Sequence, residues 1–177
     1  MNHETAWFKE SPPFRTGEEV KSERIQLKAG DAAPAFSAPG LDGEPVTLES
    51  FAGRGLVLYF YPKDNTAGCT LEAQGFRDHL ADFEALGYAV AGVSRDSVKS
   101  HCGFRDRQNL NFPLLADKEE VVCTAYGVMK EKMMYGRLCR GIERSTFVIS
   151  PEGRILHALY GVKAKTHVEE LLALLKA

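Results

Sequence analysis

The sequence predicts an α/β domain in which helices flank a central mixed β-sheet, with a short hairpin near the N-terminus. Residues 56–61 (Leu-Val-Leu-Tyr-Phe-Tyr) form a continuous apolar run of strand length, typical of a central strand buried on both faces. Helix and strand patterns alternate after this run, as they do in α/β chains. With 177 residues, of which 44% are hydrophobic, the chain is long enough to bury one such core.

The hairpin is predicted from Asp42-Gly43, a turn sequence that lies between short apolar stretches at Phe36 and 46–48. Apolar side chains at helical spacing predict a helix over about 67–86, ended by Gly87. The next predicted elements are a strand at 88–93, a helix at 97–110 capped by Asp96 or Ser97, a strand at 112–115 and a helix at 119–126. Two strands at 145–149 and 154–160, joined by a turn at 151–153, are predicted near the C-terminus. The last predicted element is a helix that follows a capping box formed by Thr166 and Glu169. No element is predicted for 127–144, where Met133, Met134 and Tyr135 are expected to fill the core rather than to line the edge of a pocket.

Composition limits the classes of partner. A formal net charge of -2 argues against binding to nucleic acid, and no apolar run is long enough to cross a membrane. The first 26 residues contain five acidic and four basic side chains and no apolar core of a secretory signal. We therefore expect a cytoplasmic protein, with residues 1–26 as a loosely ordered or docked extension and 27–177 as the folded domain.

The four cysteines lie far apart, at Cys69, Cys102, Cys123 and Cys139. They do not resemble a disulfide-rich secreted framework, they include no C-x-x-C, and no paired Cys/His spacing indicates zinc. The five histidines, at 3, 79, 101, 157 and 167, also lack ligand spacing. Scattered cysteines in a reducing compartment are most often small buried hydrophobes, so a chemical role for any of them needs further evidence.

Cys69 falls in the first turn of the predicted helix at 67–86, directly after the central strand. Unpaired backbone N–H groups and the positive end of the helix dipole favour an anion there. A free cysteine with a pKa of ~8.5 is only about 3% thiolate at pH 7, and making it mostly thiolate needs roughly 3.4 kcal/mol. A helix terminus supplies at most about 2 kcal/mol, so a cation, most naturally a guanidinium, must contribute. Without one, Cys69 would simply begin the buried stripe that continues through Ala73 and Phe76.

The residues around Cys69 resemble a known family. Pro62, Thr66 and Cys69 form P-x-x-x-T-x-x-C, the active-site signature of the peroxiredoxins. The string over 59–70 is similar to the subfamily called bacterioferritin comigratory protein, or peroxiredoxin Q. The similarity continues through 92–94, 96–98, 112–117 and 142–147, and covers the chain from about residue 27 to its C-terminus. It implies a thioredoxin-like fold.

The resemblance also implies an antioxidant, thiol-dependent peroxidase. Cys69 would attack the terminal oxygen of hydrogen peroxide or an organic hydroperoxide, releasing water or an alcohol and becoming a sulfenic acid. Thr66 would hold its hydroxyl against the thiolate and the peroxide, Pro62 would shield the pocket from water, and Arg144 would supply the positive charge. No metal or other cofactor is expected. The expected partners are the hydroperoxide and thioredoxin or a similar dithiol, and the chain is expected to be a monomer.

The resolving cysteine is a separate question, because the position at which many relatives carry it is Gln74 here. We expect Cys102 to form the intramolecular disulfide with the peroxidatic thiol, since another branch of the subfamily places its resolving cysteine on the corresponding helix. Gly103 beside it would ease the local unwinding that disulfide geometry usually demands. Cys139, in an arginine-rich stretch, is the alternative, and Cys123 is expected to be inert packing.

Two other classes of function remain open from the sequence. One is a non-enzymatic thioredoxin-fold chaperone or scaffold in which Cys69 is only structural. The other is a thioredoxin-like disulfide exchanger, which the lack of C-x-x-C disfavours. Peroxide consumption by a Cys69→Ser variant and an insulin-reduction assay distinguish these classes from a peroxidase.

Overall fold

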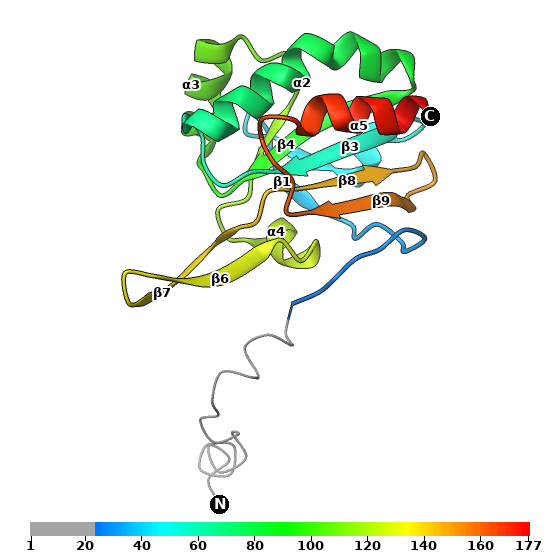
Figure 1. Cartoon of the computed structure of the whole chain (residues 1–177). Helices are drawn as coiled ribbons and strands as arrows, with labels where there is room; N and C mark the ends of the chain where they lie inside the picture. Colours follow the sequence, from blue (N-terminus) through cyan, green and yellow to red (C-terminus); the bar gives the residue numbers. More distant parts are fainter. Residues whose placement is uncertain (1–23) are drawn as a thin grey trace, which may run out of the picture.

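A computed structural model of the chain describes residues 24–177 (Figure 1). Its centre is a five-stranded sheet with the order β5-β4-β3-β8-β9. Three strands are parallel, namely β3 (Gly55–Phe60), β4 (Tyr88–Ser94) and β5 (Leu114–Ala116). The other two, β8 (Ser145–Ile149) and β9 (Ile155–Tyr160), continue the sheet in antiparallel pairing. The predicted mixed sheet is thus confirmed.

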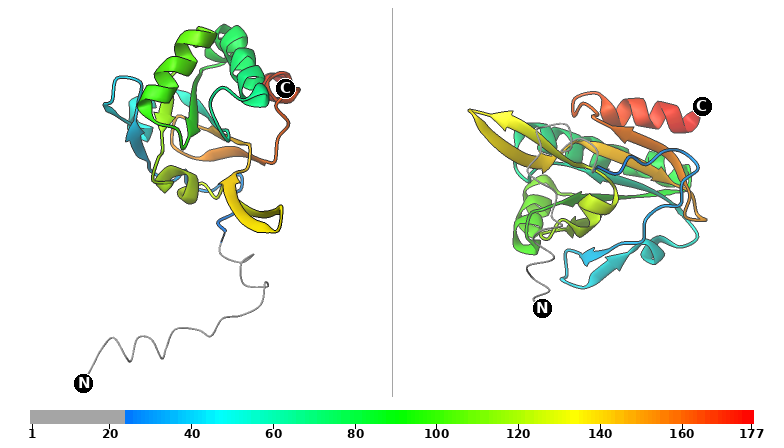
Figure 2. Two further views of the ribbon diagram at one scale, coloured as in Figure 1. Left: turned by 90° about the vertical axis from the view of Figure 1, so that its left-hand side faces the viewer. Right: turned by 90° about the horizontal axis from the view of Figure 1, so that it is seen from below.

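All six residues of β3 are buried, and its side chains alternate between the two faces of the sheet. Val57 and Tyr59 pack against α2 (Ala67–Ala85), α3 (Val98–Gln108) and α5 (His167–Lys176). Leu58 and Phe60 pack on the opposite face, with α4 (Val121–Ala125) and the N-terminal part of the domain. Figures 1 and 2 show α2 and α5 on one face of the sheet and α4 on the other. The continuous apolar run is therefore explained by a strand with a core on each side.

Helix α2 carries the predicted nucleophile. The chain leaves β3, passes through the loop 61–66, and enters α2 at Ala67 with Thr66 in the N-cap position. Gly87 follows the helix with a φ of +91°, a conformation that glycine adopts without steric cost. The predicted stripe on α2 is buried, including Cys69, Ala73 and Phe76.

Two hairpins lie outside the central sheet. The first, β1 (Ser37–Pro39) and β2 (Pro45–Thr47), contains the predicted turn with Gly43 at a φ of +83° and leads into a short 3-10 helix, η2 (Leu48–Phe51). The second, β6 (Met129–Met134) and β7 (Arg137–Ile142), was not predicted and extends away from the sheet (Figure 2). Met133 is 65% exposed and Tyr135 99% exposed, so the prediction that this cluster fills the core is wrong.

The predicted capping box at the start of α5 is also wrong, because the Thr166 side chain makes no capping hydrogen bond. Ser97 does cap α3, as predicted, by accepting a hydrogen bond from the backbone N–H of Ser100 at 3.1 Å. Helix α5 is instead held by its buried apolar side chains, which include Val168 and Leu171. Apolar burial thus fixes the C-terminal helix without the help of that cap.

The predicted extension, residues 1–26, falls mostly outside the described residues. Arg24 donates a hydrogen bond to the carbonyl of Gly127, pairs with Glu143 and lies over the ring of Tyr160. The boundary near residue 27 stays a prediction. Within residues 24–177, no helix combines the length and apolar character that crossing a bilayer requires.

Candidate active site

Cys69 is the third residue of α2 and is 1% exposed. Asn65, with a φ of +64°, turns the loop that precedes the helix, and asparagine tolerates this left-handed conformation better than most residues. The sulfur therefore lies in the first helical turn, at the carboxyl end of β3. This is the location that the sequence predicted for an anion-stabilising site.

Arg144 reaches this turn from the link between β7 and β8. Its Nη2 donates a hydrogen bond to the Sγ of Cys69 at 3.4 Å, and its Nη1 donates to Oε1 of Glu72 at 2.7 Å. The planar guanidinium thus binds two side chains that lie one turn apart on α2. A hydrogen bond from a permanently charged donor favours the anionic form of the sulfur.

Glu72 is a site residue that the sequence reasoning missed. It is 0% exposed, and burial raises its pKa to about 7 although the charge of Arg144 and its hydrogen bond both lower it. Its second oxygen, Oε2, has no hydrogen-bond partner among residues 24–177. A signal was present in the sequence, because Glu72 lies three residues after Cys69, beside the buried stripe of α2.

Arg144 is the cation for both acidic groups. Burial disfavours its charged form, but the charges of Glu72 and Cys69 outweigh burial and raise the pKa of Arg144 above its usual value. The guanidinium therefore stays charged in a half-buried position. Two groups that can become anions share this one cation, which makes the protonation of Glu72 relevant to the chemistry at the sulfur.

Gly68 allows the guanidinium to lie this close to the helix. A Cβ at this position would lie 3.3 Å from Nη2 of Arg144 and 3.5 Å from the Cβ of Ala164. The hydroxyl of Thr66 donates to the carbonyl of Lys63 at 2.8 Å and does not cap α2. Pro62 is exposed at the start of the same loop.

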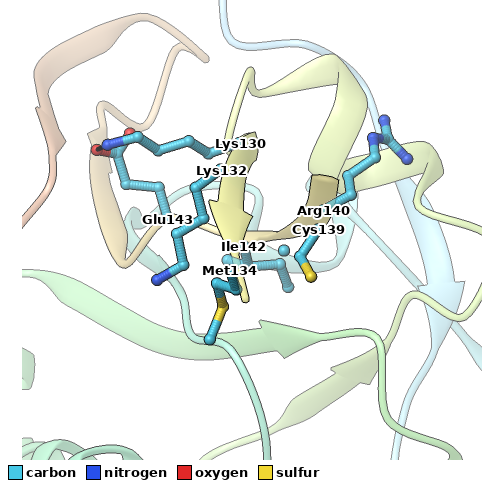
Figure 3. Close-up of a pocket in the computed structure, with 8 residues that line it drawn as sticks. Lys130, Lys132, Met134, Cys139, Arg140, Ile142 and Glu143 are labelled. Carbon is cyan, nitrogen blue, oxygen red and sulfur yellow. Dashed lines mark hydrogen bonds and ion pairs between the residues drawn. The ribbon is translucent and has the colours of Figure 1, made fainter. Parts of the chain in front are cut away.

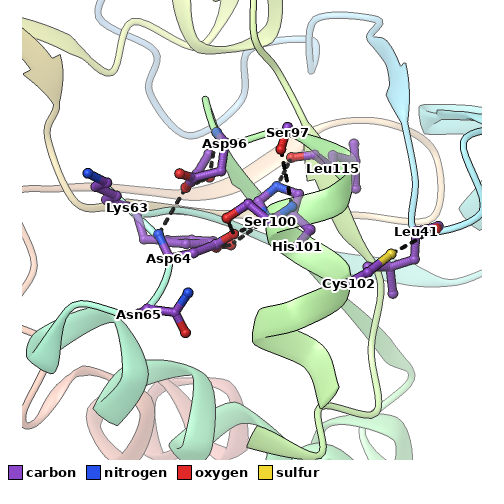
Figure 4. A network of polar contacts seen from close by, with 12 residues as sticks. Leu41, Lys63, Asp64, Asn65, Asp96, Ser97, Ser100, His101, Cys102 and Leu115 are labelled. Atoms are coloured by element: carbon purple, nitrogen blue, oxygen red, sulfur yellow. Dashed lines mark hydrogen bonds and ion pairs between the residues drawn. The ribbon is translucent and has the colours of Figure 1, made fainter. Parts of the chain in front are cut away.

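Cys102 has different surroundings. It is half-buried on α3, and its thiol donates to the carbonyl of Leu41 in the turn between β1 and β2, at 3.2 Å. Figure 4 shows this sulfur on the side of α3 away from Asn65 and the active-site loop. All four cysteines are free thiols, so the structure describes the reduced state. In this state it does not bring Cys102 into the contacts that surround Cys69.

The other two cysteines lie elsewhere. Cys139, on β7, lines a cavity of about 290 Å³ together with Lys130, Met134 and other residues of the second hairpin (Figure 3). The lining of this cavity includes neither Cys69 nor Arg144. Cys123 is fully buried, and burial, together with the charge of Asp117, raises the pKa of its thiol. This environment agrees with the inert role predicted for it.

A thiol at the N-terminus of a helix, hydrogen-bonded by a guanidinium beside a mixed sheet, is the arrangement expected of a thiol peroxidase of the thioredoxin-like class. The model of the AhpC/TSA family matches residues 29–158. The chain belongs to that family.

Individual relatives narrow the identification to the Bcp/peroxiredoxin Q type. Peroxiredoxin Bcp of Xanthomonas campestris is 50% identical over 135 residues, which cover 76% of this chain and 84% of the relative. Peroxiredoxin Bcp of Escherichia coli K12 is 41% identical over 150 residues, with coverage of 85% and 96%. A structure of a cysteine-to-serine variant of Xylella fastidiosa PrxQ matches with a TM-score of 0.80 and 42% identity, over 86% of this chain and 97% of that one.

A structure of the X. campestris bacterioferritin comigratory protein, obtained as a trapped intermediate/ligand complex, matches with a TM-score of 0.77 and 44% identity. It covers 82% of this chain and 98% of its own. These likenesses confirm the predicted family, the thioredoxin-like fold and the peroxidase class of oxidoreductase.

Proposed function

We propose that Cys69 is the peroxidatic nucleophile and that Arg144 holds it in the reactive anionic form. The observation that carries this proposal is the hydrogen bond from Nη2 of Arg144 to Sγ of Cys69, at the N-terminus of a helix. The thiolate attacks the terminal peroxide oxygen and the O–O bond breaks. The sulfur becomes a sulfenic acid, and the departing hydroxide or alkoxide takes a proton to give water or an alcohol.

Glu72 and Gly68 position the guanidinium in this proposal. Glu72 fixes one arm of Arg144, so that the other arm faces the sulfur, and Gly68 leaves room for it. The same guanidinium can stabilise negative charge on the peroxide oxygens as their bond breaks.

Thr66 and Pro62 would form the rim of the peroxide site. A threonine hydroxyl has one donor and two acceptor lone pairs. Since Thr66 donates its hydrogen to Lys63, its oxygen can accept the peroxide hydrogen and turn the terminal oxygen toward the sulfur. Pro62 has no backbone N–H, so it adds no competing donor to the rim.

The proposed substrates are hydrogen peroxide and organic hydroperoxides. The X. campestris relative is described as having alkyl peroxide reduction activity, and the similarity between the two proteins supports the same substrate class here. The site as described needs neither metal nor organic cofactor for this reaction, because the attacking atom belongs to the chain.

Cys102 is the proposed resolving cysteine, and thioredoxin or a similar dithiol is the proposed reductant of the resulting disulfide. Two structures of X. campestris peroxiredoxin Q are of serine variants at two different cysteines, with TM-scores of 0.77 and identities of 43% and 42%. That relative therefore also contains at least two cysteines, as a peroxidatic and resolving pair requires. We further propose that the protein acts as a monomer in the cytoplasm, where scattered free cysteines are usual.

The proposal is tested by peroxide consumption with a dithiol reductant, using Cys69→Ser, Cys102→Ser and, as the matched control, Cys139→Ser. Activity should vanish in the first variant, fall in the second and persist in the third. Mass spectrometry after one equivalent of peroxide should show a bridge between Cys69 and Cys102. A bridge to Cys139, or activity that survives the loss of Cys69, would overturn the assignment of these roles.

A further inference from the structure

Helix α3 has few fully buried side chains. Of its eleven residues only His101 and Phe104 are buried, and Gly103 lies between them. An internal glycine costs a helix about 1 kcal/mol relative to alanine, and an element with few buried apolar contacts opens at low free energy. This is the helix that carries Cys102, so its attachment affects when that thiol can move.

A buried ion pair joins α3 to the active-site loop. Asp64, on the loop between β3 and α2, contacts Nδ1 of His101 at 2.7 Å through Oδ2 (Figure 4), and both side chains are 1% exposed. Asp64 also accepts hydrogen bonds from Tyr61 at 2.6 Å and Ser100 at 2.8 Å. Burial opposes its ionisation, but the hydrogen bonds and charge from His101 outweigh burial and lower the pKa of Asp64.

The second ring nitrogen of His101 also faces a hydrogen-bond acceptor. Nε2 lies 2.9 Å from the carbonyl oxygen of Leu115, which can only accept a hydrogen bond. Both ring nitrogens therefore face hydrogen-bond acceptors, a carboxylate at Nδ1 and a carbonyl at Nε2. His101 is therefore clamped between the loop that precedes α2 and strand β5.

Asp96 lies next to this pair. The carboxylates of Asp64 and Asp96 and the ring of His101 place atoms that could bind a metal ion within 4.8 Å of one another. These atoms are already used inside the protein. Oδ2 of Asp96 accepts from the hydroxyl of Ser94 at 2.5 Å and from the backbone N–H of Asp64 at 2.9 Å. The group is a completed hydrogen-bond network that ties the loop to its surroundings, so we assign it no ion.

Formation of the proposed disulfide requires α3 to move. Cys102 faces Leu41, whereas Arg107 contacts Asn65 on the active-site loop and lies about 140° further around the helix. Because the two cysteines lie on separate helices and the Cys102 sulfur is turned toward Leu41, the helix must rotate or unwind before the two sulfurs meet. The Cys102 sulfur then bonds to the sulfur of the Cys69 sulfenic acid, the S–O bond breaks, and the departing hydroxide takes the thiol proton to form water.

We propose that the Asp64–His101 ion pair is a latch that holds α3 on the active-site loop and thereby sets the rate at which Cys102 reaches the oxidised Cys69. This inference rests on the proposed role of Cys102. His101 is then a positioning residue that acts through α3. While the latch is closed, the sulfenic acid stays exposed to a second peroxide, which would convert it to a sulfinic acid.

The test compares His101→Gln with Asp106→Asn, because Asp106 forms an exposed ion pair with Arg105 on the same helix. Breaking a buried pair costs far more than breaking an exposed one, so His101→Gln should speed conversion of sulfenic acid to disulfide about tenfold or more. Rapid quenching, alkylation and mass spectrometry measure this rate and the sulfinic acid fraction, which should fall. Amides of residues 98–108 should exchange hydrogen faster in reduced His101→Gln, and all three readouts should be unchanged in Asp106→Asn.

Ser100→Ala keeps the inference testable if His101→Gln fails to fold. It removes one hydrogen bond to Asp64 and should produce a smaller change in the same direction. Sulfenic acid formation is measured separately in a Cys102→Ser background, so an altered first step cannot be confused with altered resolution. If the wild type forms no Cys69–Cys102 bridge, the proposed function fails at that step. If it forms the bridge and neither variant changes its rate, only the latch is refuted.

Discussion

Replacing Glu72 with glutamine should reveal the energetic cost of a buried acid beside the nucleophile. Burial raises the pKa of this carboxyl to about 7 from its usual 4.5, so the folded protein holds a proton there that the unfolded chain has lost. Between these two pH values the folded state binds more protons than the unfolded state. The contribution of Glu72 to stability therefore falls as the pH rises through this window, and the penalty is complete above pH 7.

The magnitude follows from the width of the window. Each pH unit is worth about 1.4 kcal/mol, so Glu72 should cost about 3 kcal/mol of unfolding free energy between pH 4.5 and 8. Its side chain is fully buried, so solvent screening does not reduce this value. His167 hides the effect in the wild type, because burial lowers its pKa to about 4 and makes stability rise with pH up to about 6.5. Subtracting the unfolding free energy of the wild type from that of a Glu72 variant at each pH cancels the contribution of His167, which is the same in both proteins.

Urea denaturation of reduced wild type, Glu72→Gln and Glu84→Gln at several pH values from 4.5 to 8 measures this difference. Glu84 is exposed on the same helix and serves as the matched control. The stability of Glu72→Gln relative to wild type should rise by about 3 kcal/mol across this range, whereas that of Glu84→Gln should stay nearly constant. A relative stability of Glu72→Gln that does not change with pH would falsify the assignment of a buried, neutral-range carboxyl.

Three further variants test neighbouring parts of the site. Arg144→Lys keeps the charge but loses the fork that binds Glu72 and Cys69 together, so stopped-flow kcat/KM for peroxide should fall about 100-fold; unchanged kcat/KM would contradict a role for the fork. Gly68→Ala places a Cβ 3.3 Å from the guanidinium, and the resulting displacement of Arg144 should lower kcat/KM for peroxide about tenfold. A wild-type kcat/KM would show that the guanidinium has room to shift. The stability of His167→Gln relative to wild type should fall as the pH rises from about 4 to 6.5, because the variant lacks the contribution of the buried imidazole; a relative stability that does not change with pH would contradict this assignment.

The central part of the fold could be predicted because local pattern and tertiary environment agree there. The apolar run of β3 is buried when a core covers each face of the strand, and the apolar stripe of α2 is buried when the helix packs on the sheet. The structure contains both arrangements. The β6–β7 hairpin was missed because its turn is Tyr135-Gly136, with φ of +53° and +75°. Such turns are usually signalled by Asn-Gly or Asp-Gly, and a tyrosine in this conformation gives no local warning. The exposed side chains of this hairpin also remove the alternation that a half-buried strand would show.

The candidate site could be predicted only in part. The position of Cys69 in the first turn of a helix implied that a cation was needed, but only the family resemblance indicated Arg144, which lies 75 residues away in sequence. Glu72 was missed because a glutamate on a helix usually faces solvent. The pairing of His101 with Asp64 was also beyond local pattern, since it depends on how α3 docks on the loop.

The contact between Glu72 and Arg144 explains why a costly acid lies beside a nucleophile that must be anionic. A guanidinium bound only to the sulfur could rotate about its flexible stem, and its side chain would lose entropy when it was held. Oε1 of Glu72 accepts a hydrogen bond from Nη1 of Arg144 at 2.7 Å, and the rigid plane of the guanidinium then directs Nη2 toward Cys69. Oε2 of Glu72 has no hydrogen-bond partner among residues 24–177, and the pKa of the carboxyl is raised, so its burial is only partly compensated. The pH-dependent loss of stability at Glu72 is therefore the energetic consequence of orienting the cation that serves the sulfur.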